Sequence, residues 1–343
     1  MAIAIDIRSI WFIAAELFRP NALVLAVAVI LDLLLGDPVY PLHPIRLMGH
    51  TLTLFERALR RIGADGYGGG IALFFLLAIF WAGGTVVVLV MALIVSWKLV
   101  LAIEIFLAYS FLALRDLLKH SWAVEKAARA NDFSGARVAI ARLVGRDTDR
   151  MDIAACRRAA IESLSENLTD GFTSAIAWYV VAGLPGLVLF KVVSTMDSMV
   201  GNKTPRYLKF GWCGARLDDV MNFIPARLTW ILISAVAIFV PRCSAAKALR
   251  IGWTQHSILP GPNSGWSEAA TAGGIQRKLI GPIWMGGGLV TDVWVGDAGD
   301  PAAGEDSGDV WRASVLVCVT GLVFASIAVG IVGAWVGFGW SAG

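Results

Sequence analysis

The sequence predicts an all-α, polytopic integral membrane protein with about four to six transmembrane or re-entrant helices and a helical cytoplasmic insert. Of its 343 residues, 57% are hydrophobic and only 16% are charged, whereas about a quarter of the residues in a soluble globular domain are charged. Several apolar runs are long enough to cross a hydrocarbon core of about 30 Å. The 14 tryptophans fit this class, because indole rings favour the membrane interface.

The first part of the chain predicts the N-terminal membrane helices. Residues 1–20 are mildly amphipathic and are expected to lie on the membrane surface, and residues 21–35 form a short apolar run. Residues 71–97 and 99–114 predict a helical hairpin that turns near Lys98.

A polar, helix-rich insert follows, over residues 115–170. A helix around residues 122–130 is expected to stop at Asn131, since Asn and Gly mark helix ends and turns. A second helix over residues 136–143 leads to a loop that reads G-R-D-T, and a third helix begins near Asp152.

Two later apolar segments are marginal as membrane spans. Residues 173–193 are interrupted by G-L-P-G, and residues 228–240 form a run of only about 13 residues. Residues 242–312 read as a polar, glycine-rich loop, and a clear final span follows over residues 313–340. The sequence therefore divides into four parts. Residues 1–114 are N-terminal membrane helices, and residues 115–227 are an insert with the polar motifs and a broken apolar segment. Residues 228–312 are a marginal segment with a cytoplasmic loop, and residues 313–343 are a C-terminal transmembrane helix.

The distribution of basic residues favours a topology in which the two marginal segments are buried or re-entrant. About four spans then remain, and every loop that carries a motif falls on one side. That side holds every lysine and arginine except Arg8, Arg19 and Lys98, so the positive-inside rule makes it cytoplasmic. If both segments span instead, the motif at 197–222 lies across the membrane from the motif at 162–170.

A stripe of carboxylates is the first motif. Glu162, Glu166 and Asp170 recur every four residues, a spacing that places side chains on one face of a helix. The ordinary interpretation is a solvated helix face. The neighbouring Asn167 and Asp170–Gly171 step favour a magnesium site instead, because Mg²⁺ prefers carboxylate oxygens and substrate phosphates.

Acids and bases also gather further along the chain. Asp197 is followed by a glycine turn and then by Lys203 and Arg206, which suits a metal next to phosphate, although a basic cluster flanking a membrane has the same appearance. Beyond them, two acids and an amide offer hard oxygen ligands beside an arginine, in a pattern that is weak by itself: Asp218, Asp219, Asn222 and Arg227.

Two shorter motifs remain. Asp37 and His43 belong to D-P-x(4)-H-P-x-R and are predicted to bind the cofactor, although a lone histidine is more often structural. The loop G-P-N-S-G-W-S-E presents Asn263, Trp266 and Glu268 at the start of a helix, where anions bind, although such loops are usually only turns. There is no P-loop motif, the four cysteines show no metal-ligand spacing, and the net charge of +3 does not indicate nucleic acid.

With these residues laid out, the sequence resembles the CbiB/CobD family, the membrane-bound adenosylcobinamide-phosphate synthases of cobalamin biosynthesis. The resemblance extends from about Asp32 to the last span. The motifs that carry it are L-D-L-L-L-G-D-P with H-P-I-R, L-V-G-R-D-T, R-A-A-I-E-S-L-S-E-N-L-T-D-G, T-M-D-S-M-V-G, F-G-W-C-G-A-R-L-D-D-V-M-N-F-I-P-A-R-L-T and P-N-S-G-W-S-E-A-A-T-A-G.

The resemblance implies ATP-dependent formation of an amide between adenosylcobyric acid and (R)-1-aminopropan-2-ol phosphate or a related amino-alcohol. On this view the acids of the motifs hold Mg²⁺ and ATP and supply a proton acceptor, and the bases neutralise phosphates. Asn263 and Trp266 would face the corrinoid. The expected partners are thus the corrinoid, the amino-alcohol phosphate and the lipid bilayer of the inner membrane. The alternative is a membrane sensor that resembles the AmpE-like proteins and has no ligase activity.

Overall fold

The computed structural model describes residues 19–38 and 40–340, so the expectation for residues 1–20 lies almost wholly outside the described part of the chain. The described residues are mostly helical. Among them, five helical stretches are long and apolar enough to cross a membrane: Tyr67–Val95, Trp97–Arg129, Ile153–Val200, Trp212–Val236 and Asp309–Trp335. The prediction of an all-α, polytopic membrane protein is confirmed.

The chain forms two compact units, and each is assembled from stretches that are not consecutive. Unit 1 contains Met1–Leu112, Ser174–Met221 and Ala325–Gly343, and unit 2 contains Ala113–Thr173 and Asn222–Phe324. The four segments predicted from the sequence are consecutive stretches, so they divide the molecule differently. The predicted site residues fall into both units, and each unit is described by itself.

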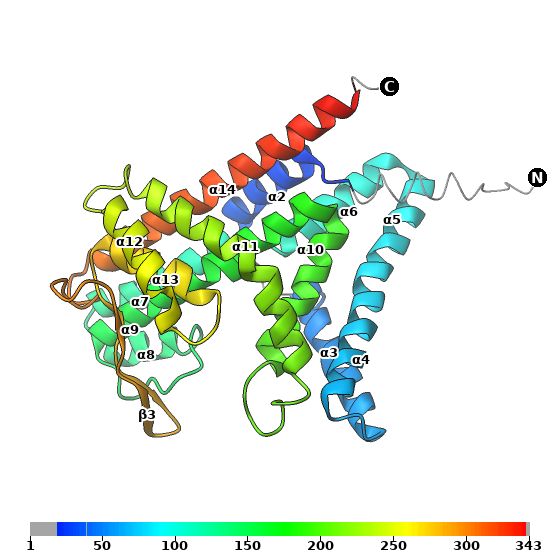
Figure 1. Ribbon diagram of the computed structural model, residues 1–343. Coiled ribbons are helices and arrows are strands. Elements are labelled where there is room, and N and C mark those ends of the chain that lie inside the picture. The colour runs from blue at the N-terminus through cyan, green and yellow to red at the C-terminus, as the bar shows by residue number, and fades with distance from the viewer. Residues whose placement is uncertain (1–18, 39, 341–343) are drawn as a thin grey trace, which may run out of the picture. The chain divides into compact units, whose positions relative to one another are not determined.

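Unit 1 is built mostly from apolar helices. The predicted hairpin is present, and its turn lies at Ser96, whose side chain accepts a hydrogen bond from the Leu99 amide. Figure 1 shows α4 continuing into α5 through a π-helical turn. The elements are α2 (Ala22–Leu35), α3 (Pro44–Arg61), α4 (Tyr67–Ala78), η1 (Ile79–Gly83), α5 (Gly84–Val95), α6 (Trp97–Ser110), α10 (Ser174–Val200), the first part of α11 (Trp212–Val236) and the last part of α14 (Asp309–Trp340).

Helix α10 is broken where the G-L-P-G sequence predicts a break. Ala182 and Gly183 have non-helical backbone angles, with φ of −145° and 58°. The positive φ favours glycine, and Pro185 lacks the amide that a continuous helix needs. The break separates a first half of about two turns from a second half that is about twice as long.

Unit 2 contains a bundle of three helices: α7 (Leu114–Arg129), α8 (Phe133–Ile140) and α9 (Ile153–Asn167). Asp152 caps α9 by accepting a hydrogen bond from the Ala155 amide, which confirms the predicted start of that helix. Asn131 has a φ of 54° and ends α7 at the predicted stop. Small and apolar side chains from the three helices form the buried core of the bundle: Val124, Ala136, Ile140, Cys156, Ala159 and Ala160.

Two expectations for the second half of the chain are wrong. Residues 228–240 are not a run of 13 residues on their own, because most of them belong to α11, which has 25 residues. Residues 242–312 are not a loop throughout. They contain α12 (Ala245–Gln255), the short helix η3 (His256–Ile258), α13 (Ser264–Ile275) and the start of α14.

Helix α13 reads like a loop because its small residues serve close packing. Its glycines allow backbone to approach backbone: a Cβ at Gly273 would lie 2.4 Å from the carbonyl oxygen of Lys247 in α12. A Cβ at Gly265 would lie 1.9 Å from the carbonyl oxygen of His256. Every residue from Gly265 to Ile275 is buried.

Four short strands complete unit 2. Strand β2 (Ile283–Met285) pairs with β3 (Gly288–Thr291), and β1 (Leu279–Ile280) pairs with β4 (Trp294–Val295), both antiparallel. Gly286 and Gly287 join β2 to β3 and have φ of 59° and 80°, as a tight two-residue hairpin turn requires.

Candidate functional site

Three of the predicted acids meet in one cavity of unit 2, which we call the acid cavity. It has a volume of about 360 Å³ and opens between α9, α13, β2 and the G-R-D-T loop. Glu162, Glu166 and Glu268 line it together with Arg146. The other residues that line it are Leu143, Val144, Gly145, Ser163, Leu259, Pro260, Ser264, Ile280, Ile283 and Met285.

Helix α9 supplies two of these acids from the predicted stripe. Glu162 and Glu166 lie one turn apart, so both reach the cavity; Glu162 is buried and Glu166 is exposed. The stripe does not continue as an α-helix to Asp170, because that residue lies in the π-helical turn η2 (Leu168–Thr173). Asn167 turns back on its own helix and donates to the Ser163 carbonyl at 2.8 Å.

Glu162 is fixed from two sides. It pairs with the Arg146 guanidinium, and its other oxygen accepts a hydrogen bond from the Ile280 amide at 2.8 Å. Arg146 was not predicted as a site residue, although the loop that carries it was part of the family resemblance. Among the described residues that line the acid cavity, it alone carries a positive charge.

Glu268 lies in the first turns of α13 and is 6% exposed. Burial raises the pKa of its carboxyl well above the ordinary 4.5, and the negative charges of Glu166 and Glu162 raise it further. Arg146 acts in the opposite direction on this pKa. The cavity therefore combines a fixed carboxylate, an exposed carboxylate and a carboxyl group that retains its proton to higher pH.

Trp266 lies beside this cavity in a stack of rings. The ring of His256 lies 3.7 Å from it at an angle of 16°, and the guanidinium of Arg227 lies 4.8 Å from the ring centroid. The side chain is 4% exposed, so the stack covers the face that was expected to meet the corrinoid. Asn263, which precedes α13, is also buried. A role for either residue in corrinoid binding stays a prediction.

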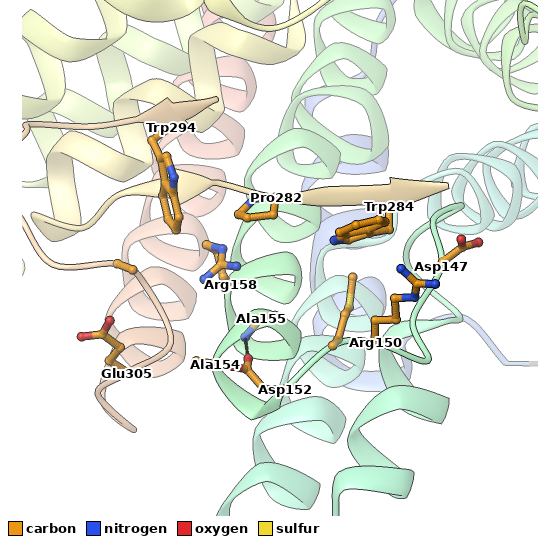
Figure 2. Close-up of a pocket in the computed structure, with 12 residues that line it drawn as sticks. Asp147, Arg150, Asp152, Ala154, Ala155, Arg158, Pro282, Trp284, Trp294 and Glu305 are labelled. Atoms are coloured by element: carbon orange, nitrogen blue, oxygen red, sulfur yellow. Dashed lines mark hydrogen bonds between the residues drawn. The ribbon is translucent and has the colours of Figure 1, made fainter. Parts of the chain in front are cut away.

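Strand β2 separates the acid cavity from a second cavity, because successive residues of a strand point to opposite sides. Ile283 and Met285 line the acid cavity, whereas Pro282 and Trp284 line the second one. The second cavity has a volume of about 400 Å³ and lies at the N-terminus of α9 (Figure 2). We call it the tryptophan cavity, after Trp284 and Trp294; it is also lined by Asp147, Arg150, Met151, Asp152, Ala154, Ala155, Arg158, Ala302 and Glu305.

The remaining predicted acids and bases lie in unit 1 or on α11. Asp197, near the end of α10, and Asp219 on α11 are close enough for their charges to interact. Asp219 also pairs with Arg216 at 3.0 Å. Asp218 is half-buried, and Asn222 is fully buried further along the same helix.

The two predicted bases of unit 1 differ in their surroundings. Arg206 donates to the buried carboxylate of Glu56 at 3.0 Å, which also accepts from Arg60 at 2.8 Å. Lys203 is exposed in the same loop. The structure therefore places Arg206 in an ion-pair network and leaves Lys203 accessible to a phosphate.

Asp37 and His43, which were predicted as binding residues, form a pair in unit 1. The His43 ring nitrogen Nε2 lies 2.7 Å from the Asp37 carboxylate. His43 is 3% exposed and precedes α3, with Pro44 as the first helical residue. Burial lowers the pKa of His43, and Arg46 lowers it too, while Asp37 raises it.

The donor chemistry of the acid cavity fits Mg²⁺, although the described residues contain no group of three or more His, Cys, Asp or Glu side chains that could hold an ion by themselves. Magnesium in nucleotide sites commonly uses one or two carboxylates and takes its other ligands from phosphates and water. Glu166, which is exposed in the cavity, and Asp170 in the adjoining turn are carboxylates of this kind.

Comparison with known proteins identifies the family over most of the chain. A family profile described as CobD/Cbib protein matches residues 25–317. The cobalamin biosynthesis protein CobD of Sinorhizobium fredii is 40% identical over 314 residues, covering 89% of this chain and 95% of that protein. The cobalamin biosynthesis protein CbiB of Salmonella typhi is 35% identical over 276 residues, covering 79% and 86%. No solved structure matches the chain at a significant level. The chain belongs to the CobD/CbiB family of cobalamin biosynthesis proteins.

Proposed function

We propose that this protein joins adenosylcobyric acid to (R)-1-aminopropan-2-ol phosphate, or a related amino-alcohol, in an ATP-dependent reaction that gives adenosylcobinamide phosphate. The observation that carries the proposal is the acid cavity, in which Glu162, Glu166 and Glu268 meet beside Arg146. Membership of a cobalamin biosynthesis family agrees with a corrinoid substrate.

Amide formation requires that the corrinoid carboxylate be activated, because a carboxylate is a poor electrophile at neutral pH. Transfer of the γ-phosphoryl group of ATP to the carboxylate oxygen gives an acyl phosphate and ADP. The amine of the amino-alcohol then attacks the acyl carbon, the C–O bond to phosphate breaks, and the nitrogen loses a proton. The products are the amide and inorganic phosphate.

The residues of the acid cavity match these requirements. Arg146, held in place by Glu162, offers a fixed positive charge to the oxygens on which negative charge develops. In its ionised form Glu268 suits the role of proton acceptor, since a buried carboxylate with a raised pKa is a stronger base than an exposed one. Glu166 and Asp170 would hold Mg²⁺, which neutralises phosphate charge when the nucleotide is bound.

We further propose that the protein lies in the inner membrane and that its acid cavity faces the cytoplasm, because ATP is available in the cytoplasm. The excess of lysine and arginine outside the apolar helices supports this orientation. The break in α10 also supports it, since a helix broken at Ala182 and Gly183 can enter and leave on one side.

The test is an assay with the purified, full-length protein in detergent or nanodiscs. Adenosylcobyric acid, ATP, Mg²⁺ and (R)-1-aminopropan-2-ol phosphate are supplied, and the corrinoid product and ADP are quantified by chromatography and mass spectrometry. We expect one ADP for each amide formed. No amide with any amino-alcohol tested, under conditions where the protein is folded, would contradict the proposal.

Variants connect the activity to the cavity. Glu166→Gln should reduce kcat by about 100-fold or more, as expected for a group that stabilises phosphoryl transfer. Asp292→Asn is the matched control, because Asp292 is an exposed acid of unit 2 that does not line the cavity. Normal turnover of Glu166→Gln at saturating Mg²⁺ would remove this residue from the metal site. A complementation test separates a ligase from a sensor. A bacterial strain that lacks its own enzyme should grow on cobyric acid when it expresses this protein if the protein is a ligase, and should not if it is a sensor.

A further inference from the structure

We propose that the tryptophan cavity binds the base and the proximal phosphates of the nucleotide: these phosphates meet Arg158, and the base stacks on Trp284. This inference rests on the proposed ATP dependence and assigns it to residues outside the acidic motifs. The cavity volume of about 400 Å³ is in the usual range for small-ligand sites.

Arg158 is the first argument. It is 9% exposed, and its Nε donates to the Ile280 carbonyl at 2.9 Å. Within the part of the chain that the structure describes, its two terminal nitrogens have no hydrogen-bond or ion-pair partner. They lie in the cavity, as Figure 2 shows. A buried guanidinium whose terminal nitrogens form no direct ion pair is costly, so this geometry favours a ligand that brings negative charge.

The negative charges of Glu162, Asp152 and Glu305 act favourably on Arg158, but none of the three acids forms an ion pair with it. Glu162, one turn further along α9, is already held by Arg146 and by the Ile280 amide. Asp152 accepts the hydrogen bond that caps α9. Glu305 lines the cavity but is exposed and forms no ion pair with Arg158.

The aromatic rings are the second argument. Trp294 lies on one side of the cavity, with the Arg158 guanidinium 4.9 Å from its ring centroid. Trp284 lies towards the other end, and Arg150 stands 4.7 Å from its ring centroid (Figure 2). Both rings are only partly buried. Arg158 is buried against Trp294, whereas Arg150 is exposed, so a nucleobase can take the place of Arg150 on the ring of Trp284 while Arg150 keeps positive charge nearby.

The backbone supports the same ligand. The N-terminus of α9, with Ala154 and Ala155, lines the cavity next to Arg158. Amide groups at a helix start attract phosphate oxygens, although here the Asp152 side chain already accepts from the Ala155 amide. The hairpin that carries Trp284 is fixed to the G-R-D-T loop, because the Asp147 amide donates to the Trp284 carbonyl at 2.9 Å and Asp147 accepts from the Gly287 amide at 2.8 Å.

The experiment measures nucleotide binding by the full-length protein in nanodiscs, with a fluorescent N-methylanthraniloyl ADP as the probe. ATP, ADP, adenosine and (R)-1-aminopropan-2-ol phosphate compete separately. We expect ATP and ADP to displace the probe, and adenosine to need at least a tenfold higher concentration. Displacement of the probe by the amino-alcohol phosphate alone, at concentrations similar to ATP, would overturn the assignment to a nucleotide.

Variants locate the site. Trp284→Leu should raise the Kd for ATP about tenfold and Arg158→Gln by tenfold or more, through loss of stacking and of charge-assisted hydrogen bonds. Arg150→Ala, an exposed change, keeps the test valid if Arg158→Gln fails to fold. Trp122→Leu is the matched control: Trp122 is a half-buried tryptophan of unit 2 with Arg129 over its ring, outside the cavity. Wild-type ATP affinity in both Trp284→Leu and Arg150→Ala would overturn the proposal.

Two failures can be told apart. If amide forms normally but these variants keep the wild-type Kd and KM for ATP, the nucleotide site is wrong and the ligase stands. If ATP binds and depends on Trp284 and Arg158 but no amide forms, the nucleotide site stands and the ligase is wrong.

Discussion

Glu268 is a residue whose charge follows directly from its surroundings, and this allows a test by pH. Its folded pKa is raised, so folding favours the protonated carboxyl. The stabilisation is fully present below the unfolded pKa of about 4.5 and is lost as pH rises through the folded pKa. Glutamine mimics the protonated form and does not titrate.

We therefore expect Glu268→Gln to gain stability relative to the wild type as pH rises above about 4.5. Denaturant unfolding at several pH values, with EDTA present to exclude bound cations, measures the difference. Asp292→Asn, which changes an exposed acid, should show no such trend. A variant that instead loses stability relative to the wild type with rising pH would show that Glu268 is ionised and paired in the fold.

Sequence spacing identified the acids of the site better than its bases. Glu162 and Glu166 were predictable because a helix places residues four apart on one face. Asp170 departed from the stripe because a π-helical turn begins after Asn167, and the sequence carries no signal for such a turn. Arg146 was missed because a loop arginine reaches its partner through tertiary structure, which spacing does not encode.

At the scale of elements, a buried ion pair joins α7 to α9. Glu125 is fully buried and accepts from Arg157 at 2.7 Å and from Arg129 at 2.7 Å. Glu125→Ala leaves Arg157 buried without its acid, so we expect a loss of about 3–5 kcal/mol in the free energy of unfolding. Urea denaturation followed by circular dichroism measures it. Glu305→Ala, at an exposed acid, should cost less than about 1 kcal/mol.

The packing of α13 gives a second prediction at this scale. Gly265→Ala would place a methyl group against the His256 carbonyl, so we expect a loss of about 1–3 kcal/mol in the free energy of unfolding and weaker activity, since Glu268 lies on the same helix. Gly299→Ala is the control, because a Cβ there meets nothing within 4 Å. Equal melting temperatures for the two variants would contradict this account of the packing.

These elements also show where prediction from sequence stopped. The helices of the insert were found because capping residues such as Asp152 and stop residues such as Asn131 act locally. The sequence of α13 reads as a loop because it is rich in glycine and alanine. These small residues allow close packing of a buried helix but give no amphipathic pattern by which a helix is predicted. The Gly286–Gly287 turn did carry a hairpin signal, between two short apolar runs, and could have been predicted.

For the whole molecule, the orientation in the membrane can be tested directly. We expect single cysteines at Lys203 and Asp292, both exposed, to react with an impermeant maleimide only from the cytoplasmic side. The experiment needs a variant without the four native cysteines. Labelling of the two positions from opposite sides would show that α11, the apolar helix between them, crosses the membrane.

The class of the molecule was predictable from composition, because a chain with so few charged residues and such long apolar runs belongs in a bilayer. The assembly of the two units was not predictable from composition. Each unit combines stretches far apart in the chain, and that pairing depends on contacts that no local pattern records.

The backbone of Ile280 links the two cavities of unit 2. Ile280 is a buried, β-branched residue with a φ of 71°, a conformation that costs about 1–3 kcal/mol. Glu162 accepts from its amide and Arg158 donates to its carbonyl, so one residue is fixed by side chains that face different cavities.

The effects of Arg158→Gln and Glu162→Gln on the free energy of unfolding should therefore not be additive. In a double-mutant cycle of these two substitutions, we expect an interaction energy of about 0.5–3 kcal/mol. A substitution in one cavity would thus change a property measured in the other cavity, because both cavities depend on the position of Ile280.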